Sequence, residues 1–334
     1  MLKEDIKTLF DSFNNKRILI IGDVMLDLYL NGKVERISPE APVPIVAVGN
    51  RFARLGGAAN VAQNIKALGA EPVLCSIIGD DSKSHDFFNL LKEHGMPGNG
   101  IVKSNERRTT TKYRIIGNNA QMLRVDDEDT FNLTDNEYQA LCDKIDTILY
   151  RERIDGIILQ DYNKGVLTEK LIRRTIAVAN EKKIPVGVDP KKNNFLAYEN
   201  CTLFKPNLKE LKEGINFDFP TDTIEGILLG VNELQDKLNC RFVMNTLSER
   251  GVLIQEMVNG KKNHYHIPAH LRKIADVSGA GDTVLGVAML CLVNDLDPYH
   301  IAAISNLAGG LVCEEIGAVP INKERLLKET EKIQ

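Results

Sequence analysis

The sequence predicts an α/β fold of three αβα layers, in which helices cover both faces of a mainly parallel sheet and a small β-sheet lid is added. Short β-branched runs alternate with segments of helical periodicity along the chain. Most of these runs have a continuous apolar centre, as the strands of a buried parallel sheet do. Two longer segments, 32–55 and 109–128, have no helical periodicity and alternate apolar with polar residues, which indicates the separate lid.

The individual elements follow from their end signals as well as from their periodicity. The predicted strands occupy 17–23, 72–80, 156–161, 184–189, 202–207 and 241–246. The predicted helices occupy 60–69, 82–95, 135–150, 168–182, 222–239 and 282–293. A further amphipathic helix at the N-terminus would pack the apolar residues Leu2, Ile6, Leu9, Phe10 and Phe13 against the body. Glycines at 69 and 95 end two of the helices.

The lid segments belong to one predicted domain that spans residues 1–334. Segment 32–55 contains three prolines, and segment 109–128 forms a hairpin that turns at Gly117, Asn118 and Asn119. No repeat, low-complexity run or long linker divides the chain. Because an exposed apolar sheet tends to be covered, we expect two lids to pair in a homodimer.

Composition excludes several classes of protein. The net charge of −4, with Lys and Arg spread along the 334 residues, gives no basic patch for nucleic acid or an anionic membrane. Six scattered cysteines form no CxxC pair, so we expect buried thiols rather than disulfides or a zinc site. The N-terminus has no signal-peptide pattern, and no apolar run approaches the ~18 residues that span a bilayer. We therefore expect a cytoplasmic protein.

The stretch ADVSGAGDTVLG, 275–286, is the most informative of the sequence. Small residues at Gly279, Ala280 and Gly281 leave the backbone amides at a helix start open to an anion such as phosphate. Asp282 then lies where a general base for phosphoryl transfer would act, although it could instead cap its own helix. The GxxxxGK[ST] and GxGxxG patterns of the common phosphate sites are absent.

Two stretches resemble the signatures of the ribokinase-like, or PfkB, carbohydrate kinases. They are GGAANVAQNIKALGAEPVLCSIIG, from Gly56, and DVSGAGDTVLGV, from Asp276; only Val287 departs, where the family has Gly or Ala. Within the family, RISPEAPVPIV (36–46), QDYNKGVL (160–167) and KPNLKE (205–210) are similar to the D-glycero-β-D-manno-heptose 7-phosphate kinases. No HxGH of an adenylyltransferase occurs before Gln334, so the resemblance is to a stand-alone kinase.

The resemblance implies roles for particular residues on the nucleotide side. Asp282 would be the catalytic base, and Gly279, Ala280 and Gly281 the anion hole for the phosphates of ATP. The run Asn207, Leu208, Lys209 and Glu210 would lie at the nucleotide, with Glu210 ordering the water shell of Mg²⁺. A capping box formed by Asn207 and Glu210 is the alternative, and both can hold together. The turn with Thr246, Ser248 and Gly251 would also bind the nucleotide.

On the sugar side, the candidates follow the first strand and open the next helix. Carboxylates and amides suit vicinal hydroxyls, because each hydroxyl both donates and accepts. The predicted sugar contacts are Asp23, Asp27, Gly56, Gly57 and Asn60. The 7-phosphate needs cations, for which the sequence offers Lys164 first and Arg124 next, with Lys191, Arg36 and Lys112 also available.

The resemblance thus implies ATP-dependent phosphorylation of the anomeric hydroxyl of heptose 7-phosphate to the 1,7-bisphosphate, a step toward ADP-heptose for lipopolysaccharide core. A kinase of another sugar or sugar phosphate is the nearest alternative. A non-catalytic sensor is a second one, although the base and the anion hole are both intact. The sequence leaves open which anomer reacts and whether a monovalent cation takes part.

Overall fold

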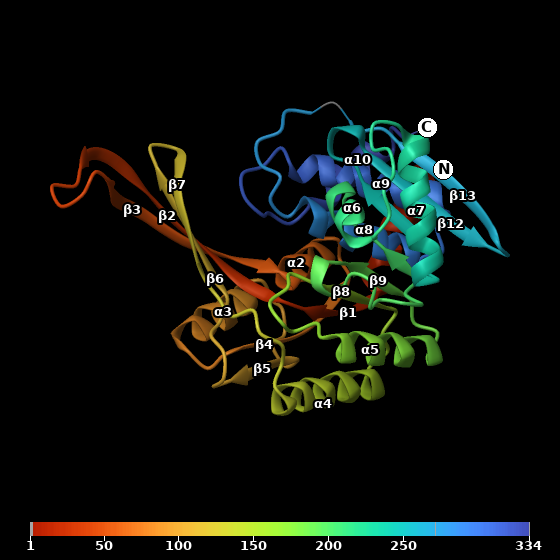
Figure 1. The fold of residues 1–334 in the computed structure, drawn as a ribbon, viewed down its shortest axis with the longest axis horizontal. Coiled ribbons are helices and arrows are strands. Elements are labelled where there is room, and N and C mark those ends of the chain that lie inside the picture. Colours follow the sequence, from red (N-terminus) through yellow and green to blue (C-terminus); the bar gives the residue numbers. More distant parts are fainter. Residues whose placement is uncertain (1–2, 271, 334) are drawn as a thin grey trace.

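The computed structural model describes residues 3–270 and 272–333, and it has the three layers that the sequence predicts. Within these residues the central sheet has nine strands in the order β13-β12-β11-β10-β9-β8-β1-β4-β5 (Figure 1). Their bounds are β1 Arg17–Gly22, β4 Glu71–Gly79, β5 Ile101–Ser104, β8 Gly156–Gln160, β9 Val186–Asp189, β10 Leu203–Phe204, β11 Phe242–Thr246, β12 Val252–Val258 and β13 Lys261–Ile267. Seven neighbouring strands pair in parallel, namely β5, β4, β1, β8, β9, β10 and β11, whereas β12 and β13 add an antiparallel hairpin at one edge.

Helices cover both faces of this sheet. Their bounds are α1 Lys3–Ser12, α2 Ala58–Ala67, α3 Ser82–Glu93, α4 Asp135–Arg151, α5 Glu169–Glu181, α6 Leu208–Gly214, α7 Ile224–Leu238, α8 Ala280–Leu292, α9 Pro298–Val312 and α10 Lys323–Thr330. Alternate side chains of β1 point to opposite faces. Ile18 and Ile20 pack with α1, α2, α3, α8, α9 and α10, whereas Leu19 and Ile21 pack with α4, α5, α6 and α7. The apolar runs of the sequence therefore become strands buried on both faces.

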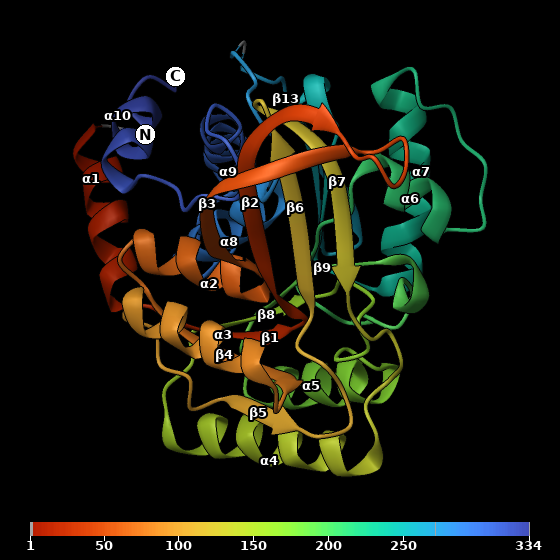
Figure 2. The same ribbon diagram turned by 90° about the vertical axis from the view of Figure 1, so that its left-hand side faces the viewer.

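The lid is a second sheet, with strand order β3-β2-β6-β7. Its strands are β2 Val24–Ile37, β3 Pro44–Gly57, β6 Thr111–Gly117 and β7 Ala120–Asp127. They project from the body in Figure 1 and stand side by side in Figure 2. The predicted turn between β6 and β7 is confirmed, with Asn118 and Asn119 at φ 52° and 64°. The lid strands extend beyond the predicted segment 32–55, because β2 begins at Val24 and β3 ends at Gly57. Strand β2 thus follows β1 almost directly and β3 leads into α2, so the lid is continuous with the body.

Some elements were not identified in the sequence. These are β5, the β12–β13 hairpin, and helices α9 and α10, whereas the start of α6 was indicated by the possible capping box of Asn207 and Glu210. The hairpin carries the Asn259–Gly260 pair, with both residues at positive φ, which is a turn signal of two-residue hairpins. The expected N-terminal helix is present and buries Ile6, Leu9 and Phe10, whereas Leu2 lies outside the described residues.

The expectation that the cysteines are buried thiols is confirmed. All six cysteines are buried and free. In 3–270 and 272–333 no cluster of three or more metal-binding side chains occurs. The described helices include none with the length and apolarity needed to cross a bilayer.

Candidate active site

The segment predicted to bind phosphate, called the phosphate loop here, comprises Gly279 and the first turn of α8. Gly279 stands at the N-cap with φ 78°, a conformation that glycine adopts without strain. The carboxylate of Asp276 accepts the backbone N–H groups of Ser278, at 2.9 Å, and Gly317, at 2.8 Å, which holds the loop in place. A Cβ on Gly279 would lie 2.7 Å from Nδ2 of Asn60, so the loop lies directly against that amide.

Asp282 is buried beside this loop, with 3% of its surface exposed. Its Oδ1 accepts hydrogen bonds from Gln160 Nε2 at 3.1 Å and from the Tyr162 hydroxyl at 2.8 Å, and its Oδ2 accepts one from Asn60 Nδ2 at 2.7 Å. The carboxylate thus faces other elements, and Gly279 rather than Asp282 occupies the N-cap of α8. Burial raises the pKa of Asp282 to about 6 even though the Asn60 and Tyr162 hydrogen bonds lower it.

Two buried acceptors flank Asp282. Oδ1 of Asn60 and Oε1 of Gln160 have no hydrogen-bond partner within the described residues. An unpaired buried acceptor is unfavourable by about 1–3 kcal/mol, so such atoms commonly mark a place where a ligand donates. Hydroxyl groups of a sugar are donors of the right kind, and they would meet Asp282 at the same point.

A pair of lysines lies on the other side of the loop. Lys205, which is 2% exposed, binds the Asp189 carboxylate at 3.0 Å. Lys191 bridges Asp189, at 3.3 Å, and Glu210. A Cβ on Gly281 would lie 3.5 Å from Lys205 Nζ, so these charges border the open amides of α8. A phosphate over Gly281 would therefore meet the ammonium group of Lys205, with the carboxylate of Asp189 beside it at 3.6 Å from the same Cβ position.

The capping box in the segment from Asn207 to Glu210 is present. Asn207 Oδ1 accepts the N–H of Glu210 at 2.8 Å, and Glu210 Oε2 accepts the N–H of Asn207 at 2.9 Å. Glu210 also reaches Lys191, so it joins the charged cluster next to Gly281 while capping α6. Asn207, Leu208, Lys209 and Ser248 line a cavity of about 560 Å³.

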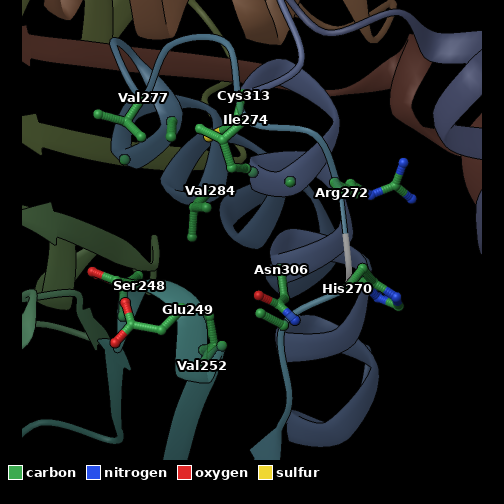
Figure 3. Close-up of a pocket in the computed structure, with 17 residues that line it drawn as sticks. Ser248, Glu249, Val252, His270, Arg272, Ile274, Val277, Val284, Asn306 and Cys313 are labelled. Carbon is green, nitrogen blue, oxygen red and sulfur yellow. The ribbon is translucent and has the colours of Figure 1, made fainter.

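A second cavity of about 490 Å³ adjoins it at Ser248. The residues predicted for the nucleotide turn line this cavity together with the α8 loop (Figure 3). These residues are Thr246, Ser248, Gly251, Ala280 and Gly281. Side chains that the sequence did not indicate complete the wall, namely Ile274, Val277, Val284, Asn306, His270 and Arg272. The predicted nucleotide residues thus surround a hollow that ends at the open amides of α8.

The sugar-side candidates divide into two groups. Asp27 is 6% exposed, holds Arg114 through Oδ1 at 2.8 Å, and lies with Oδ2 against Gly56. Asp27 therefore borders the same region as Gly57, the N-cap of α2 at φ 61°, and Asn60, in the first turn of α2. Asp23, in contrast, has no exposed surface. The prediction that Asp23 contacts sugar is corrected, because its carboxylate is occupied by backbone N–H groups of the loop that follows β8.

The two cations named first for a phosphate are engaged in ion pairs. Lys164 binds Glu128, and Arg124, half exposed, binds Asp126 at 2.9 Å. The strand register places Arg54, Lys112, Arg114 and Arg124 on one face of the lid, the face that carries Asp27. The guanidinium groups of Arg54 and Arg114 lie 5.5 Å and 5.8 Å from the ring of Tyr29 on this face.

Arg54 connects this lid face to the phosphate loop. Its guanidinium donates to the carbonyl oxygens of Ile316, at 2.8 Å, and Ala318, at 3.3 Å. The N–H of Gly317, between them, donates to Asp276, which also holds Ser278. Gln160, Tyr162, Asp189, Lys205 and Arg114 are the site residues that the sequence did not single out, although four of them lie in or beside the motifs QDYNKG, VDPK and KPN.

A buried carboxylate next to the open amides of a helix start, at the carboxyl edge of a parallel sheet, is the arrangement expected of a phosphotransferase that acts on an alcohol. The model of the family described as pfkB family carbohydrate kinase matches residues 15–325. The chain belongs to this family and is a sugar kinase.

Two sequence relatives illustrate the match. The bifunctional protein HldE of Methylobacillus flagellatus is 38% identical over 317 residues, which cover 95% of this chain and 64% of that protein. The bifunctional protein HldE of Helicobacter pylori is 36% identical over 93% of this chain and 65% of its own length. The chain thus spans slightly less than two thirds of the length of these curated relatives.

Solved structures show the same fold. Phosphofructokinase-2 from Escherichia coli, in complex with substrates and products, superposes with a TM-score of 0.76 at 17% identity and covers 95% of this chain and all of that one. Ribokinase from Arabidopsis thaliana, complexed with ribose and ATP, gives a TM-score of 0.70 at 14% identity, with 96% and 99% of the two chains covered. These comparisons confirm the ribokinase-like fold predicted from the sequence.

Proposed function

We propose that this chain phosphorylates the anomeric hydroxyl of D-glycero-D-manno-heptose 7-phosphate with ATP and yields the 1,7-bisphosphate, a precursor of ADP-heptose. The observation that carries the chemistry is Asp282, a buried carboxylate between the open amides of α8 and two unpaired amide acceptors. The substrate rests on the motifs similar to heptose 7-phosphate kinases and on the cations of the lid face.

The reaction follows from this arrangement. Asp282 takes the proton of the sugar hydroxyl while the oxygen of that hydroxyl forms a bond to the γ-phosphorus of ATP. The bond between that phosphorus and the bridging oxygen breaks, and its electron pair leaves on ADP. The amides at Gly279, Ala280 and Gly281 would stabilise the charge of the transferred group, and such positioning supplies most of the catalysis of phosphoryl transfer.

Mg²⁺ suits the charged cluster beside Gly281. Two carboxylates, Asp189 and Glu210, are present there, but each already binds a lysine. A donor set of this kind fits a cation that keeps its waters and is bound mainly by phosphates, so Glu210 would hold Mg²⁺ through water. When bound, the ion neutralises charge on the β- and γ-phosphates.

The lid face provides for the phosphate of the substrate. Arg114 is 18% exposed and lies beside Asp27, so a sugar phosphate bound there could reach it. The guanidinium group of Arg54, on β3, lies 5.5 Å from the centroid of the Tyr29 ring, and Arg124, on β7, has half of its side chain exposed. Arginine forks suit phosphate oxygens, and we assign the 7-phosphate first to Arg114, with Arg124 second and Lys164, which is bound to Glu128, last.

A coupled assay of ADP formation over a panel of sugars tests the proposal. The panel contains heptose 7-phosphate, unphosphorylated heptose, ribose, fructose 1-phosphate and fructose 6-phosphate, each with Mg²⁺ and ATP. We expect the highest kcat/KM with heptose 7-phosphate. Faster turnover of any other sugar would reject this substrate and favour another pfkB-family activity, and turnover of none would favour a sensor.

We further propose that the enzyme is a homodimer in which two lids pair. Large apolar side chains on the lid are exposed, among them Ile37 at 60%, Val43 at 51% and Leu123 at 55%. The motif RISPEAPVP lies at the tip of the lid, where β2 passes into β3, so a partner would cover it (Figure 1). Light scattering should give twice the mass of 37.2 kDa. Leu123→Glu should yield a monomer, and a wild-type monomer at all concentrations would refute the pairing.

A further inference from the structure

We propose that Tyr162 is a positioning residue that keeps Asp282 ionised and presents one oxygen of its carboxylate to the sugar. The inference rests on the proposed role of Asp282 as the base. It explains why the loop 160–167 has the sequence QDYNKGVL, which the phosphate loop and the sugar contacts leave unexplained.

The two oxygens of Asp282 are not equivalent. Oδ1 accepts two hydrogen bonds, from the Tyr162 hydroxyl and from Gln160, whereas Oδ2 accepts one, from Asn60. A carboxylate oxygen has two lone pairs, so Oδ1 is filled and Oδ2 has one left. Oδ2 is therefore the atom that takes the proton of the sugar hydroxyl, and Tyr162 helps to hold the carboxylate in that orientation.

Tyr162 differs in kind from the other two donors. Asn60 and Gln160 each have an unpaired carbonyl oxygen, so either amide can rotate and present an acceptor to a protonated Asp282. The phenol has no such alternative atom. Burial and the nearby carboxylates of Asp282 and Asp189 also hold the pKa of Tyr162 well above its ordinary value, so the hydroxyl stays protonated. Its hydrogen bond therefore favours the ionised form of the base.

The backbone fixes the phenol in place. The N–H groups of Tyr162, Lys164 and Val166 all donate to the buried carboxylate of Asp23, at 2.7, 3.2 and 3.1 Å. Gly165 has φ 87°, and a Cβ there would lie 1.8 Å from the carbonyl oxygen of Phe131. The loop can thus adopt few other conformations. In this proposal, Asp23 and Gly165 serve to fix the backbone that carries Tyr162.

Tyr162 also touches the nucleotide side of the site. Nζ of Lys191 lies 5.5 Å from the centroid of the phenol ring, and the same lysine binds Asp189 and Glu210. The ring therefore lies between the base and the cations that would meet the phosphates of ATP. A smaller side chain at 162 would open this space to water.

Tyr162→Phe keeps the ring and removes the donor, which isolates the hydrogen bond. The acid limb of the kcat/KM profile reports the base in the free enzyme. Loss of a hydrogen bond to a charged group should displace this limb by about one pH unit toward higher pH, with activity partly restored above pH 8. The KM for ATP should change little. Substrate phosphates ionise near pH 6 as well, so the displacement between the two enzymes is the quantity compared.

Tyr198→Phe is the matched control. Tyr198 is also buried and donates its hydroxyl to a carboxylate, Asp161, at 2.8 Å, but it does not contact Asp282. This variant should leave the pH profile in place, even if it lowers the melting temperature. An acid limb of Tyr162→Phe that coincides with that of the wild type, with the rate lowered equally at every pH, would overturn the inference.

Asp282→Asn, measured in parallel, separates this inference from the proposed function. If Asp282→Asn retains turnover, the assignment of the base fails and the role of Tyr162 fails with it. If Asp282→Asn is inactive while Tyr162→Phe matches the wild-type profile, only the role of Tyr162 is refuted.

Discussion

Replacing Asp282 by Asn should make the empty enzyme more stable while it removes activity. The carboxylate is 3% exposed, and its burial raises its pKa from 3.8 to about 6. At 1.36 kcal/mol per pKa unit, this difference means that the charged group destabilises the folded state by about 3 kcal/mol at neutral pH. Asparagine carries no charge, and the amides of Asn60 and Gln160 can rotate to pair with it.

Because the folded state raises the pKa of Asp282, its carboxyl group destabilises the fold only at pH values where it ionises. Below pH 3.8 the group is protonated in the folded and the unfolded chain, so it contributes nothing. Between pH 3.8 and about 6 the unfolded chain ionises first, and stability falls as pH rises. The increase in the free energy of unfolding that Asp282→Asn produces should therefore be complete above pH 6 and smaller at pH 4.5.

Differential scanning calorimetry of the ligand-free proteins measures this increase. With an unfolding entropy of about 2.1 cal/mol/K per residue, 3 kcal/mol corresponds to a rise of about 4 °C in Tm for a chain of 334 residues. The exposed Asp218→Asn is the control and should change Tm by less than 1 °C. In the coupled assay, Asp282→Asn should lose about 10²–10⁴-fold in kcat. A Tm at pH 7.5 equal to or below that of the wild type would refute the argument that the site keeps a destabilising charge.

Three further substitutions test other parts of the site and the fold. Arg114→Ala should raise KM for the phosphorylated sugar about 10- to 100-fold and leave KM for ATP unchanged, and a steady-state assay with an unphosphorylated sugar should show a smaller effect. Gly279→Ala should lower kcat, because its φ of 78° strains alanine and the new Cβ would lie 2.7 Å from Asn60; an unchanged kcat would contradict this. Arg107→Ala should lower the free energy of unfolding by about 3–5 kcal/mol in a urea titration, because Arg107 and Glu137 form a buried ion pair. Although burial raises the pKa of Glu137, hydrogen bonds from Arg107, Thr134 and Ser104 hold it at about 2. The loss of unfolding free energy in Arg107→Ala should therefore shrink as pH falls from 4.5 toward 2, and a loss independent of pH would contradict this role of the ion pair.

The layers of the fold could be predicted because they depend on local patterns. Apolar runs bounded by turn residues gave β1, β4 and β8, and the 3.6-residue period gave α4, α5 and α7. Helix α9 was not predicted, although Asp297 caps it and Pro298 is its first residue. These two residues together are a short signal, and they were not recognised as a helix start. The order of the strands could not be predicted, because no local pattern states which strands are neighbours.

Whether a site residue could be predicted depends in the same way on whether its neighbours are adjacent in sequence. Gly279 to Asp282 are adjacent in sequence, so one motif suggested them together. Gln160 and Asp189 end two separate strands, β8 and β9, and only the parallel pairing of these strands brings them to one edge. Asp23 was assigned to sugar because a carboxylate after a strand suits a hydroxyl as well as it suits backbone N–H groups.

Arg54 has a consequence for how the two substrates influence each other. This arginine belongs to the lid, yet two of its hydrogen bonds end on the segment that Asp276 ties to the phosphate loop. A sugar that changes the position of β3 would therefore also displace residues 316–318, and an anion that orders the phosphate loop would restrict the motion of β3. Cooperation between ATP and acceptor would then need no moving domain, because the guanidinium group of Arg54 would connect the two parts of the site.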